Sequence, residues 1–124
     1  MNRDDLFNTI QHGEPVQQAD LRDLDLSGAD LSGAIFEDTQ FPTAMHGCSL
    51  RESVLMRCEL RGCDLGEANL KHTLFDHGQL DDANLALAVL EVTKFHKSSL
   101  AGAKMRQTVW KVCNLIDTDV SGAD

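Results

Sequence analysis

Large apolar side chains recur at every fifth residue over most of this chain. The series starts at Leu21, runs to Val120 and contains one step of four residues, from Phe41 to Met45. It has 21 positions, of which 17 are Leu or Phe and none is polar. The residue two places before each is small, except at Leu24. A period of five matches neither the 3.6-residue turn of a helix nor the alternation of a strand, so the chain must turn once per repeat.

A corner in each repeat would let the large and the small residue point to a common axis while the other three face water. Self-similarity at a fixed short period is the signature of a solenoid, in which each unit buries its apolar face against its neighbours. The sequence therefore predicts a stack of coils whose stability comes from contacts between successive coils.

Individual repeats show a recognisable consensus. Ala29 to Gly33 (ADLSG) and Ala68 to His72 (ANLKH) resemble the A(D/N)LXX consensus of the pentapeptide repeat family, and the resemblance covers about residues 17–124. It implies an all-β fold, a right-handed quadrilateral (square) β-helix with four repeats per coil, so the 21 repeats would form about five coils. Coils one β-spacing of about 4.8 Å apart would give a rod about 25 Å long.

The repeats divide the chain into two segments. We expect an N-terminal helical cap and linker over residues 1–15, followed by the β-helix over residues 16–124. Pro42 lies in the four-residue step, cannot donate to a ladder and fixes its own φ, so a register break with a bulge or bent corner is expected near 42–47. A local kink and a partner-binding feature are both consistent with such a break.

The first residues lack the repeat and have the pattern of a short amphipathic helix. Asn2 is placed to cap it, Leu6, Phe7 and Ile10 share one face, and Gly13 is placed to end it. We expect this face to cover the first coil, because an open solenoid end exposes both apolar core and unpaired strand edge.

The last residues, Ala123 and Asp124, are the first two of a further repeat. The sequence leaves two interpretations open: a fragment of a longer array, or a homodimer in which the open C-terminal coil stacks on another copy.

Composition argues against membrane and secreted classes. No apolar run approaches the roughly 18 residues of a membrane span, and the N-terminus has no signal-peptide pattern, so we expect a cytoplasmic protein of bacterial style. All four cysteines occupy the small inward position and are predicted to be buried free thiols rather than zinc ligands or disulfides. They are Cys48, Cys58, Cys63 and Cys113.

No catalytic or cofactor-binding constellation stands out. The glycines fall at repeat corners, and neither a phosphate-binding loop nor a nucleophile elbow is present. Residues 20 apart should be neighbours one coil apart, which pairs Asp76 with His96 and His77 with Lys97. Such exposed pairs are more typical of weak ion pairs than of catalytic dyads. We therefore expect no enzyme activity, no cofactor and no metal.

Charge is unevenly distributed along the chain. The formal net charge is −9, and residues 1–45 hold nine acidic residues against two basic ones. Resemblance to the quinolone-resistance, gyrase-inhibiting members of the family implies an alternative function, DNA mimicry directed at a topoisomerase. The acidic surface for that function would comprise Asp20, Asp23, Asp25, Asp30, Glu37 and Asp38. Duplex DNA carries about one charge per 1.7 Å, so a faithful mimic about 25 Å long would need about 15 negative charges.

A second surface feature is apolar. The stacking rule places Val89 beside Val109 and Val92 beside Val112, all at outward positions, and a smaller pair, Val54 and Leu74, on the neighbouring side. The predicted stripe comprises Leu87, Val89, Val92, Val109 and Val112. Exposed apolar patches often mark contact sites, although valine also suits extended backbone.

These patterns favour a non-catalytic scaffold that binds a protein partner through the stripe and contacts neither nucleic acid nor membrane directly. The Leu-rich repeats are similar to arrays that accompany other domains in bacterial effector and secretion-accessory proteins. The repeats do not specify which protein is bound.

Overall fold

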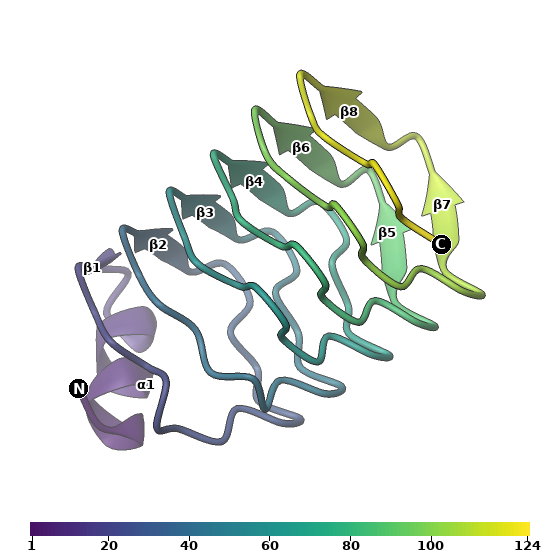
Figure 1. Cartoon of the computed structure of the whole chain (residues 1–124). Coiled ribbons are helices and arrows are strands. Elements are labelled where there is room, and N and C mark those ends of the chain that lie inside the picture. The colour runs from purple at the N-terminus through teal and green to yellow at the C-terminus, as the bar shows by residue number, and fades with distance from the viewer.

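The computed structural model describes all residues, 1–124, as one helix followed by stacked coils of short strands (Figure 1). Six strands form one parallel sheet in the order β1-β2-β3-β4-β6-β8, and β5 pairs with β7 in a second. The elements are α1 (Arg3–Gln11), β1 (Val16–Gln17), β2 (Ile35–Glu37), β3 (Val54–Met56), β4 (Leu74–Asp76), β5 (Val89–Glu91), β6 (Lys94–His96), β7 (Val109–Lys111) and β8 (Asn114–Ile116).

The register of the larger sheet establishes the coil. Leu55 pairs with Phe75, Phe75 with Phe95, and Phe95 with Leu115, so one coil contains 20 residues, or four repeats. The prediction of a square β-helix with about five coils and an N-terminal helix is confirmed. The ladder also extends one repeat earlier than the series seen in the sequence, because Val16 pairs with Phe36 and is 1% exposed.

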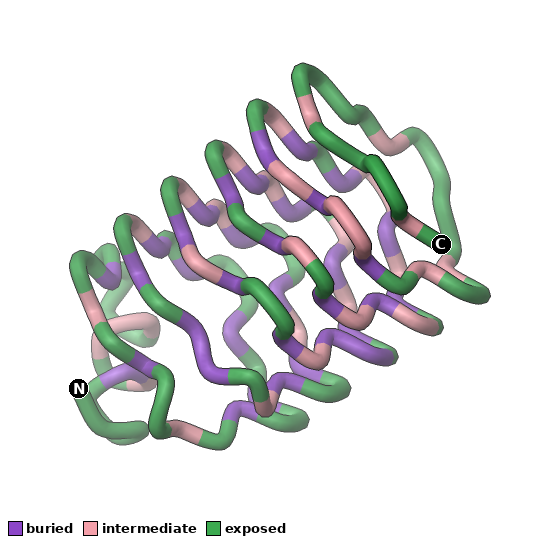
Figure 2. Tube along the Cα trace, viewed as in Figure 1, coloured by how far each residue is buried: buried purple, intermediate pink, exposed green.

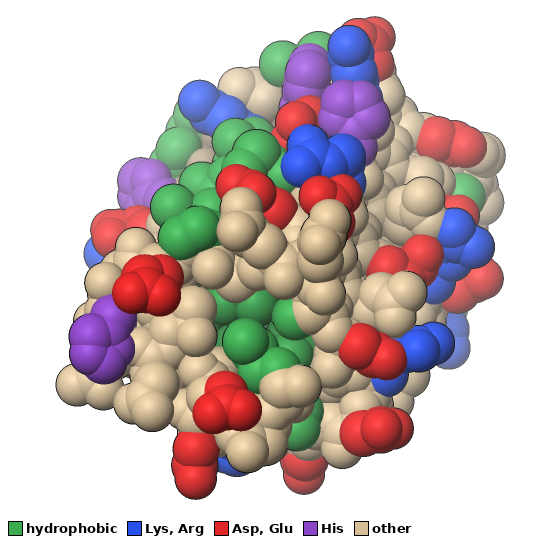
Figure 3. All heavy atoms as spheres, turned by 90° about the vertical axis from the view of Figure 1, so that its left-hand side faces the viewer, with side chains coloured by type: hydrophobic (Ala, Val, Ile, Leu, Met, Phe, Trp, Pro, Cys, Tyr) green, Lys and Arg blue, Asp and Glu red, His purple; other side chains and the backbone are tan.

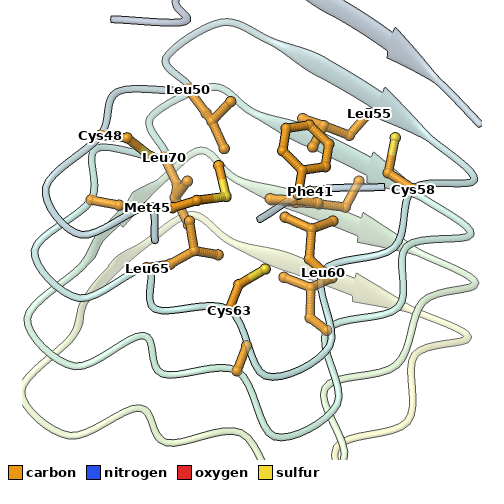
Figure 4. Close-up of a cluster of buried hydrophobic side chains, with 14 of the residues drawn as sticks. Phe41, Met45, Cys48, Leu50, Leu55, Cys58, Leu60, Cys63, Leu65 and Leu70 are labelled. Carbon is orange, nitrogen blue, oxygen red and sulfur yellow. The ribbon is translucent and has the colours of Figure 1, made fainter. Parts of the chain in front are cut away.

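The large residues point to the solenoid axis and form one continuous core. All of those from Leu21 to Leu100 are buried, within a cluster of 28 buried apolar residues (Figure 2). Figure 4 shows Met45, Leu65 and Leu70 directed into the same interior. Burial of these side chains between coils is the main favourable term in folding of such a stack.

Polar residues at the small inward position bond to the backbone of the preceding coil. The Thr73 hydroxyl donates to the Leu50 carbonyl and the Thr93 hydroxyl to the Leu70 carbonyl, each at 2.6 Å. No buried side-chain polar atom lacks a partner. Threonine and serine therefore fit where alanine would, since their hydroxyls are satisfied internally.

Most corners use a left-handed residue two places after the large one. Glycine adopts this conformation without steric cost, as at Gly28 with φ +68° and Gly33 with φ +72°. Other corners hold side chains with similar angles, among them Asp38 with φ +49° and His77 with φ +54°. The corner geometry is a property of the coil and is imposed on whichever residue occupies it.

The four-residue repeat shortens one corner while the ladders continue on both sides of it. Ile35 pairs with Val54, 19 residues later, whereas Val54 pairs with Leu74, 20 residues later. No residue between Asp38 and Gly47 has a positive φ, and the Pro42 carbonyl accepts the Cys63 thiol at 3.0 Å. The four-residue repeat is thus one residue shorter at its corner, and the strand hydrogen bonds on either side are kept.

Helix α1 covers the first coil. The Asn2 side chain accepts the Asp5 N–H at 2.8 Å, and the Asp5 carboxylate accepts the Asn2 N–H, which completes a capping box. Leu6 is fully buried, and Phe7 and Ile10 pack against the core. No helix in the structure has the length and apolar character that a membrane span requires.

The coil at the other end has an uncovered inward face. Trp110 is 38%, Leu115 43% and Val120 41% exposed, although they occupy the position that is buried in every earlier coil. Their burial requires a neighbour on both sides, and in the structure they have one on one side only.

Candidate interaction surfaces

The predicted stripe lies on the side of the solenoid formed by β5 and β7. Val89 pairs with Val109, and Glu91 pairs with Lys111, so the two valines lie side by side and point outward. Val92 donates its N–H to the Lys111 carbonyl at 2.8 Å, which places it at the following corner. The structure thus brings the predicted residues together on one side and its two corners.

Exposure within the stripe varies from residue to residue. Val112 is 78%, Leu87 48% and Val109 42% exposed, whereas Val89 and Val92 are half-buried. Apolar side chains at outward positions of this solenoid are therefore accessible to a partner.

A second apolar column crosses β2, β3 and β4. Ile35, Val54 and Leu74 are aligned in register, and Ile35 is 38% exposed. The stacking rule predicted Val54 and Leu74 but missed Ile35, because the shortened corner changes the spacing to 19 residues. The four-residue step from Phe41 to Met45 was the feature of the sequence that could have revealed this shorter spacing. Figure 3 views the molecule from the left-hand side of Figure 1. Hydrophobic side chains gather there in two areas, which charged residues border.

The acidic residues of the alternative surface are distributed around the coil. Successive repeats occupy successive sides, so Asp20, Asp25 and Asp30 lie on three different sides, and Glu37 lies on the fourth, on β2. Asp23 is exposed on the first coil. The structure does not gather these carboxylates along one face.

Several of these acidic residues also have local partners. Asp20 accepts two hydrogen bonds from the Arg22 guanidinium, at 2.9 and 2.8 Å, which lower the pKa of this carboxyl to about 2. Asp38 accepts from Arg57 at 2.8 Å. Asp25 and Asp30 accept backbone N–H groups two residues later, as Asx turns do. Part of the negative charge is thus neutralised or used within the coil itself.

The predicted pair of Asp76 and His96 is present. His96 Nδ1 lies 2.8 Å from Asp76 Oδ1, and His77 Nδ1 lies 3.0 Å from the same oxygen. The hydrogen bond from His96 is the main reason that the pKa of Asp76 lies below its usual range. No group of three or more metal-ligating side chains that could hold an ion is present. The cluster consists of hydrogen bonds between surface side chains.

Surface hollows offer little to a small ligand. The two largest, of about 400 and 360 Å³, lie on either side of His77, and at most one hydrophobic residue lines each. Ligand pockets are mostly apolar and enclosed.

His46 lies between two carboxylates on another corner. Its Nε2 is 2.8 Å from a Glu67 oxygen and its Nδ1 is 3.4 Å from an Asp64 oxygen. Hydrogen bonds that the imidazolium donates to Glu67, and secondarily to Asp64, raise the pKa of His46 above its usual value.

This pKa shift predicts a small pH dependence of stability. A raised folded pKa contributes stability that is fully present below about pH 6.5 and is lost as the pH rises through the folded value. We expect the contribution of His46 to the melting temperature to fall between pH 6 and pH 8, and His46→Gln to remove it. Melting curves at the two pH values, with NMR titration of the imidazole, measure this. A pKa of His46 at or below 6.5 would contradict the prediction.

The four cysteines are free, and three of them are fully buried. Burial raises the pKa of Cys48 and Cys63 to about 12 and that of Cys58 to about 11. Since the thiolate is the reactive form, these thiols should be inert in the folded protein. Cys113 is half-buried in the last coil.

We therefore expect one thiol, Cys113, to react in the native chain with a disulfide reagent such as DTNB at pH 8. The other three should react at least about 100-fold more slowly, through opening of the coils. Chemical unfolding should release all four thiols. Serine substitution at Cys113 is the control, and rapid labelling that persists in it would show that the inner coils open readily.

The fold and the repeat together define a parallel β-solenoid repeat protein. A sequence profile described as pentapeptide repeats matches eight copies, over residues 16–50, 43–76 and 53–91. The chain belongs to the pentapeptide repeat family.

Solved structures support the same fold. HetL, a pentapeptide repeat protein involved in heterocyst differentiation regulation from the cyanobacterium Nostoc sp. strain PCC 7120, matches with a TM-score of 0.79 and 20% identity, over 87% of this chain and 46% of its own. A trypsin-treated variant of QnrB1, a plasmid-mediated fluoroquinolone resistance protein, matches with a TM-score of 0.62 and 17% identity, over 88% of this chain and 55% of its own. The chain spans about half the length of these proteins. No curated protein sequence matches it significantly.

Proposed function

We propose that this chain is a non-catalytic scaffold that binds a protein partner through Leu87, Val89, Val92, Val109 and Val112, called the valine stripe below. The observation that carries the proposal is the exposure of apolar side chains at positions that face water, with Val112 78% and Leu87 48% exposed. The free cysteines fit a reducing compartment, and we place the function in the cytoplasm. The chain would act alone or as the repeat segment of a larger bacterial effector or secretion-accessory protein.

Site-specific photo-crosslinking tests this function. A photoreactive phenylalanine analogue at position 112 should give a covalent adduct with a single protein in cells, whereas the same analogue at His72, an exposed corner of an earlier coil, should not. Adducts at position 72 with none at position 112 would refute the stripe as the contact surface.

DNA mimicry is the competing function. The net charge of −9 favours it, but the acidic residues lie on all four sides and two of them, Asp20 and Asp38, are bound to arginines. We expect an equimolar amount of the chain to leave gyrase supercoiling unchanged. Inhibition that weakens as salt rises, and that is lost in Glu37→Gln, would support the mimic instead.

The exposed inward face of the last coil is a second candidate surface, on which another copy of the chain could stack. Stacking of a second copy on it would cover Trp110, Leu115 and Val120, and we propose a homodimer through this face. Light scattering across a range of concentrations should show a dimer for the chain and a monomer for Trp110→Lys. A monomer at all concentrations would refute the dimer and leave the valine stripe untouched.

A further inference from the structure

Two corners of the valine stripe hold side chains that fit their backbone poorly. Val92 has φ +54° and Val112 has φ +51°, in the left-handed region. They are the only β-branched residues among the non-glycine residues with positive φ, the others being mainly Asp, Glu, Gln, His and basic residues. A branched Cβ is the least suitable side chain for this conformation.

Packing within the chain does not compensate for this strain. Val112 is 78% exposed, and Val92 is covered only in part. Glycine, aspartate and glutamine serve at equivalent corners of the same coils, for example at Gly102, Gln107 and Asp117. The coil imposes the left-handed conformation at these corners, so the strain comes from the valine side chains that occupy them. Residues held in unfavourable backbone conformations cluster at binding sites.

Positive charge surrounds the stripe. Residues 83–111 contain five basic residues and one acidic residue, Glu91. Lys111 lies within the stripe, and the N–H of Leu87 donates to the Arg106 carbonyl, which places Arg106 beside the stripe's edge. The Arg106 guanidinium is itself paired with Asp124 at 2.7 Å. Lys94 and Lys104 make no ion pair. Residues 112–124 add three aspartates and no basic residue, so the positive charge lies beside the stripe and does not extend over this whole end of the protein. The stripe itself is therefore suited to a negatively charged segment.

The charges within the stripe alternate from coil to coil. The Glu91 carboxylate lies 3.6 Å from the Lys71 ammonium and 3.9 Å from that of Lys111. Glu91 lies among the apolar residues of the stripe, and a carboxylate there disfavours contact with an anionic lipid surface. A protein segment can place its own acidic groups on the lysines and avoid Glu91, so the geometry favours a peptide over a membrane.

We propose that the valine stripe binds a short acidic segment of another protein, whose apolar side chains contact Val109 and Val112 and whose carboxylates pair with Lys111 and the basic residues beside it. This inference rests on the proposed function and specifies the chemistry of the partner. Apolar contacts would supply most of the affinity, and the charges would supply selectivity and speed of association.

Selection from a random twelve-residue peptide library displayed on phage, with the intact 124-residue chain as bait, tests the chemistry. We expect the enriched peptides to be net negative and to carry at least two large apolar residues. Synthetic peptides from the selection, labelled with fluorescein, then give dissociation constants by anisotropy. The affinity should fall as salt rises, because the ion pairs are exposed.

Two variants and one control localise the binding. Val112→Asn should weaken binding about tenfold, and it should raise the melting temperature by about 3 °C since asparagine tolerates the left-handed corner. Loss of binding in a more stable protein cannot come from misfolding. Lys111→Gln should weaken binding about threefold at low salt. Gln18→Asn changes a left-handed corner of the first coil, with φ +50°, and should leave binding unchanged.

The outcomes separate the two proposals. Neutral or basic peptides that require Val112 would overturn the acidic partner and leave the interaction surface standing. Enriched peptides insensitive to Val112→Asn, or no enrichment at all, would overturn the acidic-segment proposal, and photo-crosslinking at position 112 judges the scaffold function independently. Sedimentation with phosphatidylserine vesicles should show no binding. If the chain does bind the vesicles, and Val112→Asn abolishes this binding, the stripe would be assigned to a lipid surface instead.

Discussion

Leu65→Asp is expected to unfold the chain at room temperature, with a loss of at least about 4 kcal/mol in the free energy of unfolding. Leu65 is 0% exposed and points to the solenoid axis (Figure 4). An unpaired carboxylate there has no hydrogen-bond donor to meet it, and its burial costs several kcal/mol. The whole stability of a small domain is about 5–15 kcal/mol. Urea unfolding followed by circular dichroism measures the change.

Glu67→Lys, two residues away, is the control for the inward and outward assignment. The Glu67 side chain is 59% exposed, and its contact of 2.8 Å with His46 is a surface ion pair. We expect its loss to cost less than about 1 kcal/mol. Equal destabilisation by the two substitutions would contradict the solenoid orientation of these residues.

Phe75→Ala is expected to cost about 3–5 kcal/mol, the second largest effect. The Phe75 and Phe95 rings stack on successive coils with centroids 4.9 Å apart and an interplanar angle of 3°. Truncation leaves a cavity between two coils that the rigid ladders on either side cannot close. The same unfolding experiment measures the loss.

Two further variants show whether stacking of the Phe75 and Phe95 rings itself contributes to the free energy of unfolding. Phe75→Leu should recover most of the stability, because Leu55 and Leu115 fill the same column elsewhere. A double-mutant cycle with Phe95→Ala should give a coupling of about 1 kcal/mol. Additive losses would mean that the rings contribute only by their buried area.

The coil could be predicted from sequence because one local rule applies at every repeat. A five-residue period with a large and a small residue at fixed places determined which side chains point inward, and the structure agrees from Leu21 to Leu100. It also predicted that Asp76 and His96 would be neighbours, which they are, at 2.8 Å. Both follow from spacing along the chain alone.

The candidate site was only partly predictable. Spacing identified the valines and their neighbours, but Ile35 was missed because one shortened corner changed the register across β2 and β3. The left-handed conformation of Val92 and Val112 was not evident either, since a corner's φ depends on how the coil closes.

By itself, the sequence determined the repeat, the family, the inward face and the capping helix, because each depends on residues close together in the chain. Only the tertiary structure decided how much of each side chain is exposed. Trp110 and Leu115 carry the same signal as buried residues such as Leu90, yet they are 38% and 43% exposed. In a solenoid, burial requires a coil on both sides of a residue, and that condition belongs to the stack rather than to the repeat.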